Sequence, residues 1–125
     1  MNAKHYVSLT AAKKLKELGY VNNNGFFFHA TERSYRMLHG NPLKPEELVT
    51  NMYYAPTLLE AMDWLEERGI VVNVYLLASF RQKGFTYCIA FADVKDNIYS
   101  NDNNEFFPDK YSAYHAAIEK ALELL

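Results

Sequence analysis

The side chains best suited to chemistry are four histidines and one cysteine, and their spacing argues against a shared site. The histidines show no short ligand spacing such as H-x-x-x-H, and none stands beside the cysteine, so the sequence predicts no zinc site. Cys88 falls inside an expected strand with no cue for a histidine partner, which favours simple packing over nucleophilic catalysis. A lone cysteine also excludes an internal disulfide. The histidines are His5, His29, His39 and His115.

Acidic residues and common catalytic motifs give no better signal for an enzyme. Glu60, Asp63, Glu66 and Glu67 share the solvent face of an expected helix, whereas acid–base catalysis needs carboxylates in contrasting, usually buried, surroundings. The loop at 93–105 is rich in Asp and Asn but lacks the glycine and the spacing of an EF-hand. The motifs G-x-S-x-G, G-x-x-x-x-G-K and G-x-G-x-x-G do not occur. We therefore expect a protein that is not an enzyme and that uses no cofactor or metal.

Basic residues gather near the start of the chain. Through position 44, seven lysines and arginines stand against two glutamates, although the whole chain has a net charge of −2. Such an asymmetry can mark a nucleic-acid-binding end, but a solvated lysine face explains it as well. The stretch K-G-F-T-Y-C at 83–88 resembles the start of the aromatic strand motif of RNA-recognition domains, although the pattern breaks at Ala90. Nucleic-acid binding is thus the alternative hypothesis, with a candidate basic patch of Lys13, Lys14, Lys16, Arg33 and Arg36.

Aromatic residues are abundant, with 10 tyrosines and 8 phenylalanines among 125 residues. Each such ring buries about 150–250 Å², so a core of this size does not readily accommodate all of them. Tyrosine tolerates partial exposure and is enriched in interface cores. We therefore expect a non-catalytic binding or accessory protein with a protein partner, seen first as a homodimer that uses Tyr35 and Tyr53. The alternative is a second aromatic cluster under the 40–51 loop. The candidate partner surface consists of Phe26, Phe28, Tyr35, Tyr53 and Tyr54.

Three amphipathic helices are expected to position these residues. The first starts after Ser8, a good N-cap, and stops at Gly19. The second starts at the capping box T-L-L-E at 57–60 and stops at Gly69. The third follows Asp109 and runs to the end of the chain. Helical spacing predicts that its buried face carries Tyr111, Tyr114, Ile118, Ala121, Leu122 and Leu125.

Short strands are expected between the first two helices, and a longer pair after the second. Residues 26–28 and 35–39 read as a hairpin, and 52–54 as a further short strand. Residues 70–78 and 85–92 read as an antiparallel pair, with another short strand at 98–99. Together these elements predict one α+β domain over residues 1–125, in which three amphipathic helices pack on a small, mainly antiparallel sheet.

Three stretches also suggest an origin. They are Y-V-S-L at 6–9 with A-K at 12–13 and L-K-E-L-G-Y at 15–20, then A-P-T-L at 55–58 with E-A-M-D-W-L-E-E at 60–67, and A-A-I-E-K-A-L at 116–122. Together they resemble a group of small uncharacterised proteins carried by prophages and integrative elements of gut bacteria. The resemblance implies a bacterial or phage cytoplasm and an unknown function, and it carries no known active-site residues. A cytoplasmic location also fits an N-terminus without signal-peptide features and an apolar run, at 70–78, far shorter than the ~20 residues of a membrane span.

Overall fold

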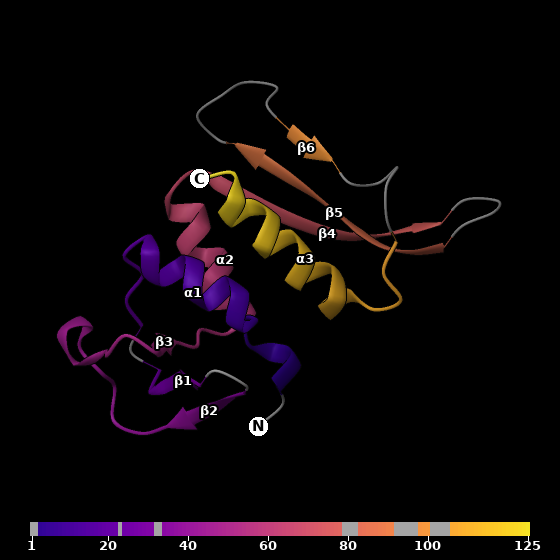
Figure 1. The fold of residues 1–125 in the computed structure, drawn as a ribbon. Helices are drawn as coiled ribbons and strands as arrows, with labels where there is room; N and C mark the ends of the chain where they lie inside the picture. The colour runs from indigo at the N-terminus through magenta and orange to yellow at the C-terminus, as the bar shows by residue number, and fades with distance from the viewer. Residues whose placement is uncertain (1–2, 23, 32–33, 79–82, 92–97, 101–105) are drawn as a thin grey trace. The chain divides into compact units, whose positions relative to one another are not determined.

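The computed structural model describes residues 3–22, 24–31, 34–78, 83–91, 98–100 and 106–125. These residues form three α-helices and six β-strands, drawn in Figure 1. The predicted α+β class is confirmed, but the strands form two antiparallel sheets where one was expected. The chain divides into two compact units, Met1–Thr57 and Leu58–Leu125. Among the helices of the described part, none is both long and apolar enough to cross a membrane.

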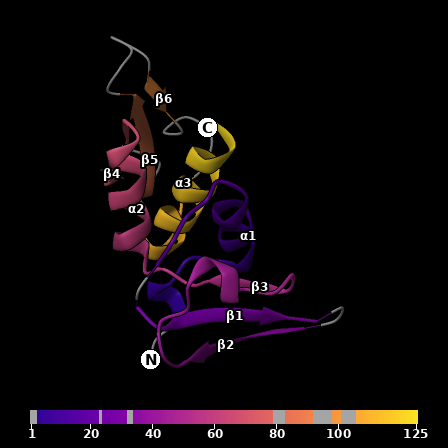
Figure 2. The same cartoon turned by 90° about the vertical axis from the view of Figure 1, so that its left-hand side faces the viewer.

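The first unit contains one α-helix, a three-stranded sheet and two short 3₁₀ helices. The sheet has the order β2-β1-β3, so that β2 and β3 are its two edges, and β1 pairs with both in antiparallel fashion (Figure 2). All three strands lie where the sequence predicts them. The elements are Ala3–His5 (3₁₀), α1 at Leu9–Glu17, β1 at Phe26–Ala30, β2 at Tyr35–His39, Pro45–Glu47 (3₁₀) and β3 at Met52–Tyr54.

Helix α1 begins and ends as its local sequence predicts. The hydroxyl oxygen of Ser8 accepts a hydrogen bond of 3.1 Å from the backbone N–H of Ala11, which satisfies one of the free donors of the first turn. Gly19 adopts a φ of 85°, a left-handed conformation that favours glycine and ends the helix. Ala11, Ala12 and Leu15 are buried, and α1 contacts β3.

The second unit combines the other two helices with the second sheet, whose strand order is β4-β5-β6. Helices α2 and α3 pack against each other and against β4, and α3 also packs along β5 (Figure 1). Leu65, Ile70 and Ile89 are almost completely buried, so the core of this unit lies between the helices and the sheet. The elements are α2 at Leu58–Glu67, β4 at Ile70–Ala78, β5 at Lys83–Phe91, β6 at Ile98–Ser100 and α3 at Lys110–Glu123.

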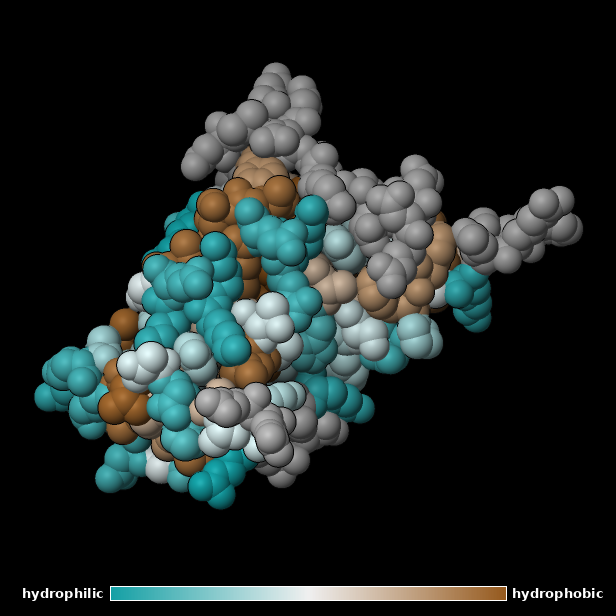
Figure 3. Space-filling view, in the orientation of Figure 1, coloured by the Kyte–Doolittle hydropathy of each residue, from teal (hydrophilic) through white to brown (hydrophobic). Residues whose placement is uncertain are grey.

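The predicted buried face of α3 is confirmed at Ile118, Ala121 and Leu122 and is wrong at its three other positions. Tyr111 and Tyr114 are only half-buried, and Leu125 is 46% exposed. Ala113 and Ala117 are buried in place of the tyrosines, because alanine lets a helix approach its neighbours closely while bulky rings are left at the margin. Leu124 and Leu125, at the end of the chain, are exposed. Figure 3 shows hydrophobic surface in the region where Figure 1 marks the C-terminus. The buried residues of α3 are Ala113, Ala117, Ile118, Ala121 and Leu122.

Strand β5 is also held by the segment that precedes α3. Phe85 and Phe107 form an isolated antiparallel bridge, in which each backbone N–H donates to the other's carbonyl at 2.9 and 2.8 Å. The approach is close at Gly84, where an added Cβ would lie 3.1 Å from both Phe106 Cβ and the carbonyl oxygen of Phe107. A side chain at this position would therefore be crowded by the neighbouring backbone.

A candidate protein-binding edge

The hairpin of β1 and β2 places most of the predicted partner surface. At the end of the hairpin opposite its turn, the carbonyl of Gly25 accepts a 2.9 Å hydrogen bond from the N–H of Gly40. Gly25 has a φ of 80°. At its turn the N–H of Thr31 donates to the carbonyl of Ser34 at 2.7 Å. A side chain at Gly25 would collide with the carbonyl of Gly40, so only glycine allows the strands to enter the hairpin this way.

These two end bonds fix which backbone groups of β2 face outward. In an antiparallel pair, hydrogen-bonded and non-hydrogen-bonded residue pairs alternate. Because Gly25–Gly40 and Thr31–Ser34 are hydrogen-bonded pairs, Arg36 and Leu38 also direct their N–H and C=O groups toward β1. The intervening residues of β2 direct theirs away from the sheet, and within the described residues these groups make no hydrogen bond. The outward residues are Tyr35, Met37 and His39.

The opposite edge of the same sheet is closed by side-chain and backbone contacts. The N–H of Met52 donates to the carbonyl of Val49 at 3.0 Å. The Nζ of Lys16, on α1, donates to the carbonyl oxygens of Val49 at 2.9 Å and Met52 at 3.0 Å. A lysine that occupies an edge carbonyl blocks pairing with another strand. The other outward residue of β3, Tyr54, is buried at 4% exposure. The β3 edge is therefore occupied at Met52 and buried at Tyr54, whereas three of the five residues of β2 are exposed.

The five aromatic residues of the predicted partner surface differ widely in exposure. Phe28 and Tyr54 are buried, at 3% and 4% exposure, while Phe26 and Tyr53 are half-buried and Tyr35 is 56% exposed. Two short rows of rings nevertheless reach β2. Phe28 meets Tyr35 edge to face at 5.7 Å, and Phe26 lies between Tyr6 at 5.0 Å and His39 at 4.2 Å. The prediction missed His39 and Met37, which a strict alternation along 35–39 could have indicated.

Tyr54 is buried and contacts the 40–51 segment, so it is not part of the exposed surface. Its hydroxyl donates a 2.8 Å hydrogen bond to the carbonyl of Leu43, and its ring meets Tyr20 edge to face at 6.2 Å. Burial raises the pKa of Tyr54 above its ordinary value, and the negative charges of Glu46 and Glu47 raise this pKa further. The neutral hydroxyl is therefore the form that the fold favours, as its role as a donor requires.

The predicted basic patch is only partly brought together. Lys13 and Lys16 both lie over the ring of Tyr53, at 5.9 and 5.0 Å from its centre, whereas Lys14 pairs with Glu17 at 3.5 Å. Arg36 is the cross-strand neighbour of His29, on the opposite face of the sheet from Tyr53, which neighbours Phe28. Arg33 lies outside the described residues. The lysines and Arg36 therefore do not form one surface.

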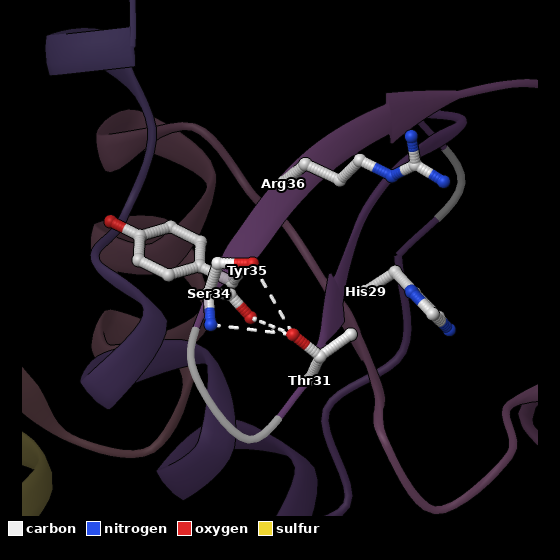
Figure 4. Close-up of a pocket in the computed structure, with 5 residues that line it drawn as sticks. All are labelled: His29, Thr31, Ser34, Tyr35 and Arg36. Carbon is white, nitrogen blue, oxygen red and sulfur yellow. Dashed lines mark hydrogen bonds between the residues drawn. The ribbon is translucent and has the colours of Figure 1, made fainter.

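A pocket of about 260 Å³ lies beside the turn of the hairpin and is lined by His29, Thr31, Ser34, Tyr35 and Arg36 (Figure 4). The figure shows the imidazole of His29 and the guanidinium of Arg36 on one side of the hairpin, with the ring of Tyr35 on the other. The hydroxyl of Thr31 is engaged with Ser34, both with its carbonyl at 3.0 Å and with its hydroxyl at 3.2 Å. Arg36 is exposed and makes no such contact with the residues that the structure describes.

Asn51 sets the orientation of the imidazole in this pocket. Its Nδ2 donates to the carbonyl of Ala30 at 3.0 Å, which identifies the amide nitrogen, and the same atom lies 3.2 Å from His29 Nε2. Because an amide NH₂ only donates, Nε2 must accept, and the proton of a neutral imidazole then resides on Nδ1. His29 and Arg36 thus present donors on one side of the hairpin, an arrangement suited to a carbonyl or a carboxylate.

Other residues considered for chemistry remain apart. Within the ranges that the structure describes, no three His, Cys, Asp or Glu side chains lie close enough to hold a metal ion. Cys88 is a free thiol, half-buried in β5.

In comparisons with known proteins, the chain matches no protein-family model, no curated protein and no solved structure.

Proposed function

We propose that this chain is a non-catalytic protein-binding module that takes up a strand of another polypeptide along β2. One observation carries the proposal: the outward N–H and C=O groups of Tyr35, Met37 and His39 have no hydrogen-bond partner among the described residues, while the β3 edge is closed by Lys16. An extended peptide that adds to an exposed edge satisfies such groups, and the flanking side chains then select its sequence.

The side chains along β2 support this use. Three of its five residues are exposed, whereas only three of the nine residues of β4, an edge of the second sheet, are exposed, and β4 also packs against α2 and α3. Tyr35 and His39 lie on one face of β2, and Arg36 beside the pocket lies on the other. A bound strand would therefore meet aromatic rings on one face and a positive charge on the other.

Selection from a displayed library of random peptides tests the proposal without a known partner. We expect selected peptides to slow amide hydrogen exchange at Tyr35, Met37 and His39, because these N–H groups become hydrogen-bonded. Met37→Pro removes an outward N–H while leaving the ladder to β1 intact, and it should abolish peptide binding. The matched control is Met37→Ala, which keeps the N–H and should retain binding.

Protection that maps to β4 instead, or binding that is indifferent to Met37→Pro, would contradict the proposal. Circular dichroism of each variant shows whether a loss of binding reflects a loss of fold.

The alternative function, nucleic-acid binding, has weaker support, because the basic side chains are divided between Tyr53, Glu17 and the opposite face of the sheet. For this alternative we expect only weak, salt-sensitive binding in a fluorescence titration.

A further inference from the structure

We infer that the strand taken up by β2 is the β2 strand of a second copy of this chain, paired antiparallel about a two-fold axis at Met37. The inference rests on the proposed function, because it names the partner of the same edge. The sheet β2-β1-β3 of each copy would continue into that of the other, joined through the two β2 strands.

The spacing of the outward groups favours this register. Tyr35, Met37 and His39 are the first, middle and last residues of β2. A two-fold axis at Met37 sets Met37 opposite itself and Tyr35 opposite His39 of the second copy, as hydrogen-bonded pairs. Every outward N–H and C=O of both strands then has a partner. An axis at Arg36 pairs Tyr35 with Met37 of the second copy and leaves His39 without one of these three residues as its partner. An axis at Leu38 pairs Met37 with His39 and leaves Tyr35 without such a partner.

The aromatic rows support the same register. One row consists of Phe28 and Tyr35, and the other consists of Tyr6, Phe26 and His39. The rows reach β2 at Tyr35 and at His39, respectively. Pairing about Met37 brings Tyr35 of each copy against His39 of the other, so the two rows become continuous across the interface. Tyr35, the most exposed ring on this strand at 56%, would be covered. Cross-strand aromatic pairs are among the stabilising pairs of antiparallel sheets.

Charge on the opposite face also selects this register. With the axis at Met37, Arg36 faces Leu38 of the second copy, and the two guanidinium groups are displaced along the strands. An axis at Arg36 would place the two guanidinium groups directly opposite each other, which is destabilising. Charge therefore disfavours the register with its axis at Arg36, while the backbone groups are best satisfied by the register with its axis at Met37.

Cysteine cross-linking tests the register. In a Cys88→Ser background, Met37→Cys places two thiols on residues whose Cα atoms are about 5.5 Å apart in a hydrogen-bonded pair, within the range of a disulfide. Arg36→Cys is the matched control, because position 36 is more exposed but lies diagonally from its counterpart, beyond the about 7 Å limit. On a non-reducing denaturing gel after mild oxidation, we expect Met37→Cys to run as a disulfide-linked dimer and Arg36→Cys to show little covalent cross-linking.

Light scattering after size exclusion provides the second measurement. The unmodified chain should show twice its 14.5 kDa mass at micromolar concentration, and Tyr35→Ser should weaken dimerisation at least about fivefold through loss of two symmetric aromatic pairs. A wild-type monomer, or faster cross-linking of Arg36→Cys than of Met37→Cys, would overturn the inference. If the chain is monomeric and Met37→Pro still abolishes binding of selected peptides, the proposed function stands. If the chain is monomeric and binding of the selected peptides is indifferent to Met37→Pro, both proposals fail.

Discussion

Replacing Thr86 by valine should stabilise the protein. The side chain of Thr86 lies in β5, is 0% exposed, and its hydroxyl has no hydrogen-bond partner among the described residues. A hydroxyl buried without a hydrogen bond costs about 1–3 kcal/mol in protein mutational data. Valine has nearly the same shape and an equally good strand propensity, so the substitution removes this cost without opening a cavity. We expect a gain of about 1–3 kcal/mol in the free energy of unfolding.

Urea denaturation followed by circular dichroism measures the gain directly. With an m-value of about 2 kcal/mol per molar urea, a gain of about 2 kcal/mol raises the midpoint by about 1 M. Thr86→Ser is the control, since it keeps the hydroxyl but deletes a buried methyl group and should lose about 1 kcal/mol. If Thr86→Val is less stable than the wild type, the hydroxyl has a partner in the fold and the reasoning is wrong.

Three further substitutions test the packing of each unit by the same denaturation assay. Leu65→Ala should cost about 2–5 kcal/mol because Leu65 is fully buried on α2, and an unchanged midpoint would contradict that placement. Gly84→Ala should cost about 1–3 kcal/mol, since its Cβ would press on Phe106 and on the backbone of Phe107; a neutral result would show that this contact gives way. The raised pKa of Tyr54 stabilises the fold below its unfolded pKa of about 10, and this contribution is lost as the pH rises through the folded pKa. The wild type should therefore lose stability relative to Tyr54→Phe above about pH 10, and parallel pH profiles would refute this.

The sequence alone determined the local elements of this protein. Ser8 and Gly19 bound the first helix, and Gly69, with a φ of 82°, follows the second, because caps and left-handed glycines act within a few residues. The hairpin at 26–39 and the α+β class followed from β-rich runs separated by turn residues. These signals are short in range, so one chain is enough to predict them.

Only the tertiary structure decided how those elements combine. Nothing local distinguishes one sheet from two, because strand pairing depends on residues far apart in the chain. The same holds for the candidate site: Lys16 closes β3 from more than 30 residues away, which leaves β2 as the open edge. Leu125 and the tyrosines of α3 matched a helical stripe, yet the alanines were buried, because the depth of a helix against its neighbours depends on the surface that receives it. Periodicity predicts a face, and packing decides which part of that face is covered.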